Sequence, residues 1–227
     1  LSFDREEIQD LVYLGEGVIA QGSRFDPAAV DWVDPELLEY YIDYDPDRSN
    51  ALLDEMGMKD TDGDGYRERP DGSNFLIQNI YSEQYGPIRL NELWQGYFKN
   101  IGLNMTLKEV TTDEFRALQG ANKQDMSMNT GQYTALDLAS RSLQFSPPFA
   151  SYFGATVGLP WAVWLDGEGG IEPPEYVKDW VKWADDFQQY EMGSDEQNAI
   201  GMKLNEGMTK SLYWIGSVGQ LPNLLVI

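Results

Sequence analysis

Apolar and polar positions alternate between two periods along the first half of the chain. Helical spacing of apolar residues predicts helices over residues 4–14, 45–56, 87–100 and 112–120, with Ser2 as the N-cap of the first. Two-residue alternation predicts strands over residues 74–81, 103–110 and 125–129. The strand–helix–strand–helix–strand order is typical of an α/β lobe with a mainly parallel sheet.

The sequence pattern in the second half of the chain predicts mainly helices. Pro173-Pro174 begins a helix that runs to about Tyr190, and Ser194 begins another that runs to about Lys210. Short strand-like runs follow over residues 214–218 and 224–227. Residues 20–46 and 138–172 are rich in Pro, Asp or aromatic residues, and we expect them to be irregular.

An acidic loop between the second predicted helix and the first strand resembles half of a calcium site. Asp60, Asp62 and Asp64 alternate and Gly65 follows at the sixth position, which is the order of oxygen ligands and turn glycine in a calcium loop. The remaining candidate ligands are the Tyr66 carbonyl, Glu68 and Asp71. A bound calcium ion would be structural, because a strand and not a helix follows. The alternative is an Asp/Gly turn without an ion.

The candidate ligand site follows the third predicted strand, because ligands of parallel α/β sheets bind beyond the carboxyl ends of strands. It comprises Asn129, Thr130, Gly131, Gln132, Tyr133 and Thr134. These residues offer hydrogen bonds and one aromatic face; the alternative is an ordinary turn with Asp137 as an N-cap. Trp161 is a further candidate, since its ring could stack on a sugar or cover a peptide side chain. The alternative for Trp161 is the hydrophobic core.

Composition excludes several classes of function. The net charge of −22 argues against nucleic acids and anionic membrane surfaces as partners. The sequence has no Cys and no His, which excludes thiol nucleophiles, Cys/His zinc sites and a Ser-His-Asp triad. No catalytic residue or required cofactor is identified. The 38 acidic residues still leave open a carboxylate pair of the kind that hydrolyses glycosides.

Several landmarks occur in an order and spacing that resemble a known family. They are Asp4-Arg5-Glu6-Glu7-Ile8, Tyr44-Asp45-Pro46, Asp62-Gly63-Asp64-Gly65-Tyr66-Arg67-Glu68, Leu93-Trp94-Gln95 and Lys99-Asn100-Ile101-Gly102-Leu103. This order resembles the family 5 extracellular solute-binding proteins, which are the oligopeptide, dipeptide and nickel-type receptors of ABC importers. The resemblance covers residues 1 to about 137.

The resemblance implies a fold and a location. Residues 1–227 would form a single periplasmic-binding-protein type II-like lobe, a mixed sheet flanked by helices. It would be the C-terminal lobe of a two-lobed receptor, with the N-terminal lobe and export signal outside this sequence. The receptor would be a periplasmic or extracellular monomer that captures a solute without catalysis and delivers it to the membrane subunits of an ABC permease.

The resemblance also implies an oligopeptide-like solute, with one departure. Peptide-binding members place an acidic residue where Thr134 stands here, and a hydroxyl cannot neutralise a peptide ammonium group. An oligosaccharide is therefore the alternative solute within the family. A carboxylate-based glycoside hydrolase or a calcium-binding module are the alternatives from other classes.

Overall fold

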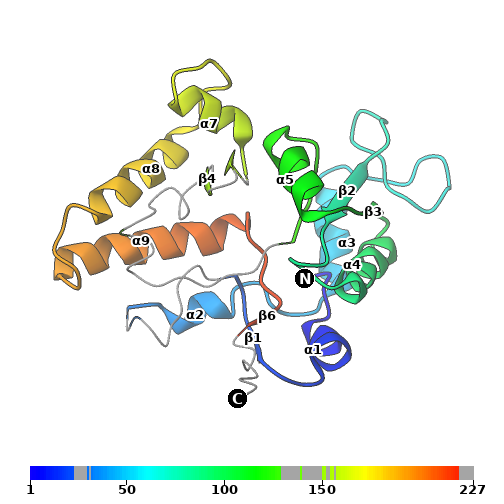
Figure 1. The fold of residues 1–227 in the computed structure, drawn as a ribbon. Coiled ribbons are helices and arrows are strands. Elements are labelled where there is room, and N and C mark those ends of the chain that lie inside the picture. The colour runs from blue at the N-terminus through cyan, green and yellow to red at the C-terminus, as the bar shows by residue number, and fades with distance from the viewer. Residues whose placement is uncertain are drawn as a thin grey trace.

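The elements of the computed structural model confirm most of the expected order (Figure 1). The structure describes residues 1–22, 30, 32–128, 139, 150–151, 154–155 and 157–219. The helices are α1 (Arg5–Tyr13), α2 (Pro35–Leu38), α3 (Pro46–Glu55), α4 (Ile88–Asn100), α5 (Thr112–Gly120), α7 (Leu159–Leu165), α8 (Glu175–Phe187) and α9 (Asp195–Ser211). The strands are β1 (Val18–Ile19), β2 (Leu76–Tyr81), β3 (Asn104–Glu109), β4 (Ala150–Ser151), β5 (Gly154–Ala155) and β6 (Val218–Gly219).

The central sheet is the parallel pair β2 and β3, which α4 connects. The third predicted strand is reduced, among the described residues, to a single parallel bridge between Asn79 and Met126. Its neighbour Asp125 explains the short pairing, because the Asp125 side-chain Oδ2 accepts the hydrogen bond of Gln78 N at 2.9 Å. A side chain thereby takes a ladder position that a backbone carbonyl would otherwise hold.

Helix α4 is anchored by aromatic contacts with the N-terminal segment. The rings of Phe3 and Trp94 stack with centroids 5.4 Å apart, and both side chains are buried. Leu90 and Ile8 lie in the same core cluster, so α1 and α4 share one apolar interface. The N-cap of α1 is Asp4 and not the predicted Ser2: Asp4 Oδ1 accepts the hydrogen bond of Glu7 N at 2.9 Å.

The second core lies between α8 and α9, which run beside each other in Figure 1. Close packing there depends on two glycines of α9. A Cβ on Gly207 would approach Trp180 Cε2 to 2.7 Å, and a Cβ on Gly201 would approach Trp32 Cη2 to 2.7 Å. The predicted cap of α9 is confirmed, because Ser194 Oγ accepts from Gln197 N at 3.2 Å.

Segments from the two ends of the chain meet at the antiparallel pair β1 and β6. The buried Arg5 joins them, because its Nε donates to the Gly216 carbonyl at 3.0 Å and its Nη1 to the Ile42 carbonyl at 2.8 Å. Gln21 adds a second link, since its Oε1 accepts from Gly216 N at 2.7 Å. The strand predicted over residues 214–218 is shorter than expected. The side chains of Arg5 and Gln21 form hydrogen bonds with backbone groups that would otherwise extend the strand pairing.

Candidate functional site

Helix α7 is apolar along its whole length, yet none of its residues is buried. Its sequence is Leu-Pro-Trp-Ala-Val-Trp-Leu, and sequence reasoning expected this region to be irregular. A helix that is apolar on all sides is normally enclosed by a core. In α7 only Trp164 is exposed and the other residues are half-buried, which indicates a surface that contacts another molecule or another part of the protein.

Trp161 of α7 lies against a glycine and a tyrosine. A Cβ on Gly158 would come within 2.3 Å of Trp161 Cε3, so the indole ring lies directly over this residue. Gly158 has φ 63°, the left-handed region in which glycine has no steric penalty. On another side, the Tyr213 ring meets Trp161 edge-on with centroids 6.3 Å apart. These contacts fix the ring of Trp161 at the surface of the helix.

Tyr213 is also joined to Tyr176 of α8. Their hydroxyl oxygens are 2.7 Å apart and share a hydrogen bond in which either can donate. The Tyr176 ring in turn meets Trp180 edge-on at 5.4 Å. Burial, followed by the hydrogen bond with Tyr176, raises the pKa of Tyr213 to about 12, so its phenol is neutral at physiological pH.

The other tryptophan of α7 has a charged neighbour. Lys178 Nζ lies 5.3 Å from the ring centroid of Trp164, within the range of a cation–π contact. The same ammonium group binds Glu172 Oε1 at 2.6 Å and Glu175 Oε1 at 2.9 Å. We call Trp161, Trp164, Tyr176, Trp180 and Tyr213 the aromatic cluster.

The residues predicted to bind ligand have different outcomes. Asn129, Thr130, Gly131, Gln132, Tyr133 and Thr134 lie outside the described residues. Trp161 is half-buried in α7, and its role in binding stays a prediction. Sequence reasoning missed Tyr176 and Tyr213, which stand 37 residues apart. Their only local signal was the position of Tyr176 in the first turn of a helix that begins after Pro174.

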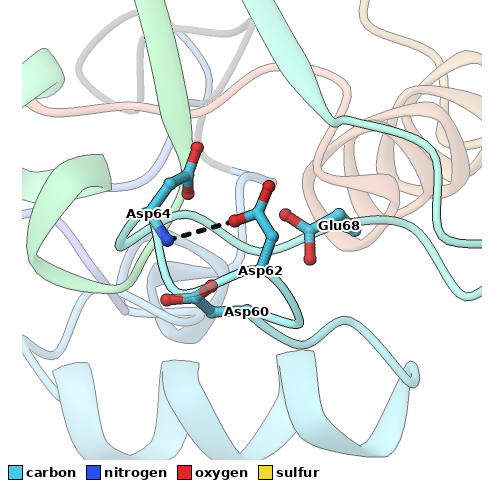
Figure 2. A group of neighbouring side chains, drawn as sticks. All are labelled: Asp60, Asp62, Asp64 and Glu68. Carbon is cyan, nitrogen blue, oxygen red and sulfur yellow. Dashed lines mark hydrogen bonds between the residues drawn. The ribbon is translucent and has the colours of Figure 1, made fainter.

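The acidic loop is a separate candidate site, between α3 and β2. One carboxylate oxygen from each of Asp60, Asp62, Asp64 and Glu68 lies within 4.8 Å of the others (Figure 2). Backbone N–H groups shape the loop: Asp60 Oδ1 accepts from Gly63 N at 2.7 Å, and Asp64 Oδ1 accepts from Tyr66 N at 2.8 Å. The three aspartates are exposed, whereas the side chain of Glu68 is buried.

These donors fit a hard divalent cation. Calcium takes six to eight oxygen ligands, and this loop offers carboxylates from an alternating acidic run with a buried glutamate behind it. Hydrogen bonds from the Thr61 side chain and backbone lower the pKa of Glu68, which keeps this carboxyl ionised. Asp71 is turned elsewhere, because its Oδ1 accepts from Ser73 N at 2.9 Å and from Ser73 Oγ at 2.7 Å. Among the described residues, the metal-ligand group therefore omits Asp71.

Arg67 attaches the acidic loop to the helices around it. Its side chain donates to Ile101 O at 3.0 Å and to Met58 O at 2.7 Å, and it pairs with Asp54 at 2.6 Å. The backbone contributes as well, because Arg67 N donates to Gly102 O at 2.7 Å. The loop is thus fixed to the ends of α3 and α4 independently of any ion.

A family model matches the first two thirds of the chain. The family is described as bacterial extracellular solute-binding proteins, family 5 Middle, and the match covers residues 1–151. The sequence matched none of the curated proteins with which it was compared. Among the described residues, helices long and apolar enough to cross a membrane are absent.

Solved structures share the fold at low sequence identity. An oligopeptide-binding protein OppA is 24% identical, with a TM-score of 0.84, over 96% of this chain and 36% of its own. A mannohexaose-bound periplasmic oligopeptide-binding protein from Thermotoga maritima is 19% identical, with a TM-score of 0.70, over 96% of this chain and 40% of its own. MelB from Agrobacterium fabrum, in complex with stachyose, is 18% identical, with a TM-score of 0.69, over 95% of this chain and 31% of its own. The chain therefore has the periplasmic-binding-protein fold and spans less than half the length of these proteins.

Proposed function

The chain belongs to the bacterial extracellular solute-binding proteins, family 5, and from this premise we propose that it forms one lobe of the substrate-binding component of an ABC importer. The family match over residues 1–151 is the observation that carries the proposal. The similar structures are more than twice as long as this chain, which supports a receptor whose second lobe lies outside these 227 residues. In this proposal, ligand is held between the lobes and is released unchanged.

The solute we propose is an oligopeptide or an oligosaccharide. Proteins with this fold have been solved with different solutes, as the names of the oligopeptide-binding, mannohexaose-bound and stachyose-bound structures state. The apolar helix α7, which has no buried residue, supports a binding surface on this lobe, with Trp161 as its candidate contact. We further propose that the receptor is monomeric, works at the outer side of the cytoplasmic membrane and passes its solute to the permease subunits.

A calcium-stabilised loop is a second proposed property. It is supported by the convergence of the Asp60, Asp62, Asp64 and Glu68 carboxylates within 4.8 Å. Four neighbouring negative charges repel one another unless a cation or solvent screens them. Calcium would relieve this repulsion and would fix a loop that is already attached through Arg67. The role would be structural and separate from solute capture.

Native mass spectrometry of the complete protein tests the receptor proposal. We expect one solute molecule per protein chain to co-purify, and the same solute to be recovered chemically unchanged after prolonged incubation with the protein. Release of shortened saccharides or peptides during that incubation would contradict a binding function and favour a hydrolase. A variant lacking the apolar face of α7, with Trp161→Ala and Trp164→Ala, should co-purify with less solute.

A further inference from the structure

Three side chains of the aromatic cluster have a chemistry that favours one class of solute, and this inference rests on the proposed receptor function. We propose that Trp161, Tyr176 and Tyr213 form a subsite for an uncharged carbohydrate ring. The receptor proposal leaves the solute as either a peptide or a saccharide. This subsite favours the saccharide and assigns its binding to side chains of α7, α8 and the segment after α9.

The first argument is access. Tyr176 retains 45% of its surface exposed to solvent, and Trp161 and Tyr213 are half-buried, so each of the three side chains keeps some accessible surface. A pyranose ring has a face of C–H groups that packs favourably on a flat aromatic side chain, and tryptophan offers the largest such surface. The Trp161 ring is covered by Gly158 and met edge-on by Tyr213, so its orientation is set before any solute arrives.

The second argument is hydrogen bonding beside the rings. The Tyr176 hydroxyl shares one hydrogen bond with Tyr213 at 2.7 Å. If the Tyr176 hydroxyl donates this bond, its oxygen can still accept hydrogen bonds through its lone pairs. If the hydroxyl accepts this bond, its O–H group can still donate and its second lone pair can still accept. Sugar hydroxyl groups both donate and accept, so they can form a hydrogen bond with the exposed Tyr176 hydroxyl in either case. A ring face next to such a phenol matches a molecule that is apolar on one face and hydroxylated at its edge.

The third argument is charge. Lys178, which lies over the Trp164 ring, binds two carboxylates, those of Glu172 and Glu175, so these three groups together carry a net negative charge. A peptide carboxylate group would have to compete with these two carboxylates for Lys178, whereas an uncharged sugar would not. The net charge of −22 also disfavours an anionic solute. The cluster thus fits a neutral hydroxylated ring better than the carboxylate end of a peptide.

Titration calorimetry on the complete protein tests this subsite, with cellohexaose, mannohexaose, maltohexaose and penta-alanine as probes. We expect at least one hexaose to bind. Tyr176→Phe should weaken that binding about three- to tenfold, the effect of one net hydrogen bond. Trp161→Ala should weaken it at least about tenfold, as expected for a central aromatic contact. Tyr190→Phe is the matched control, because Tyr190 is also 45% exposed but lies beyond the opposite end of α8, and it should change affinity less than about twofold.

The outcomes separate this inference from the receptor proposal. Binding of penta-alanine without any hexaose would overturn the carbohydrate assignment and leave solute binding intact. Hexaose binding that Tyr176→Phe and Trp161→Ala leave unchanged would overturn the subsite only. Failure of all four probes would overturn the carbohydrate assignment, and absence of any co-purified solute in native mass spectrometry would then overturn the receptor function as well. Equal unfolding midpoints of wild type and Tyr176→Phe establish that a loss of binding is not a loss of folding.

Discussion

The Tyr97 hydroxyl lies 2.6 Å from Glu7 Oε2 and thereby links α4 to α1. Tyr97 is buried, whereas Glu7 is exposed and can be rehydrated when the hydroxyl is removed. Tyr97→Phe should therefore lower the free energy of unfolding by about 1 kcal/mol at pH 8, the usual net value of one hydrogen bond. Urea unfolding of the complete protein measures this difference, and an unchanged stability would show that the hydrogen bond contributes nothing.

The same tyrosine should make the protein sensitive to alkali. Burial, and then the hydrogen bond to Glu7, raise the pKa of Tyr97 above its ordinary value of 10.0. The unfolded chain loses this proton near pH 10 while the folded protein keeps it, so the stabilisation is complete below pH 10 and declines above it. The decline should be about 1.4 kcal/mol per pH unit for this group. Wild type should lose stability more steeply between pH 10 and 11 than Tyr97→Phe; equal slopes would contradict the assignment.

Arg67 should be the most sensitive position of the acidic loop. Its side chain is only 15% exposed and donates to the carbonyls of Met58 and Ile101. Arg67→Met keeps much of the aliphatic volume but leaves these acceptors without their donor, at a cost of about 2 to 4 kcal/mol in unfolding free energy. The control is Arg48→Met, because Arg48 pairs with Glu55 in solvent, with both side chains more than half exposed. Its loss should cost less than about 1 kcal/mol.

Gly158 should matter for more than its backbone conformation. Alanine at φ 63° costs roughly 1 to 2 kcal/mol, and its Cβ would also displace the Trp161 ring. Gly167→Ala is a matched control, since Gly167 has φ 77° but no atom within 4 Å of an added Cβ. Near-ultraviolet circular dichroism should change for Gly158→Ala and not for Gly167→Ala. Indistinguishable spectra of both variants would show that Trp161 does not depend on this glycine.

Calcium should raise the unfolding temperature of the complete protein relative to the same protein in chelator. The effect follows from binding to the folded state alone and amounts to about 2.7 kcal/mol at a calcium concentration of one hundred times Kd. The double variant Asp62→Asn and Asp64→Asn should lose the increase, whereas Asp71→Asn should retain it, because Asp71 is turned toward Ser73. If the wild-type unfolding temperature is the same in calcium and in chelator, the loop does not bind calcium.

The sequence predicted those elements whose signal is local. The apolar spacing of α4 and the alternation of β3 were sufficient to predict these two elements, because each pattern is complete within the element itself. Among the described residues, the strand expected at residues 125–129 is reduced to one bridge, where the side chain of Asp125 replaces a backbone acceptor. Helix α7 was missed because it is short and apolar on every side, and such a segment has no helical periodicity to detect.

The candidate site could be predicted from the sequence only in part. Trp161 could be proposed from residue type alone, since its ring could stack on a sugar or cover a peptide side chain. Its partners could not be proposed, because Tyr176 and Tyr213 come together only when α8 packs on α9. Conversely, the acidic loop was fully visible in sequence, as its ligands lie within one short run.

The pairing of β1 with β6 has a consequence for synthesis. Val18 and Gly219 are register partners, although almost the whole chain separates them. A ribosome must therefore release nearly all of these residues before the strand pair and the Arg5 contact to Gly216 can form. Contacts of such large sequence separation slow folding, since loop closure must precede them. During synthesis, the segment around β1 would thus remain without its strand partner until β6 emerges.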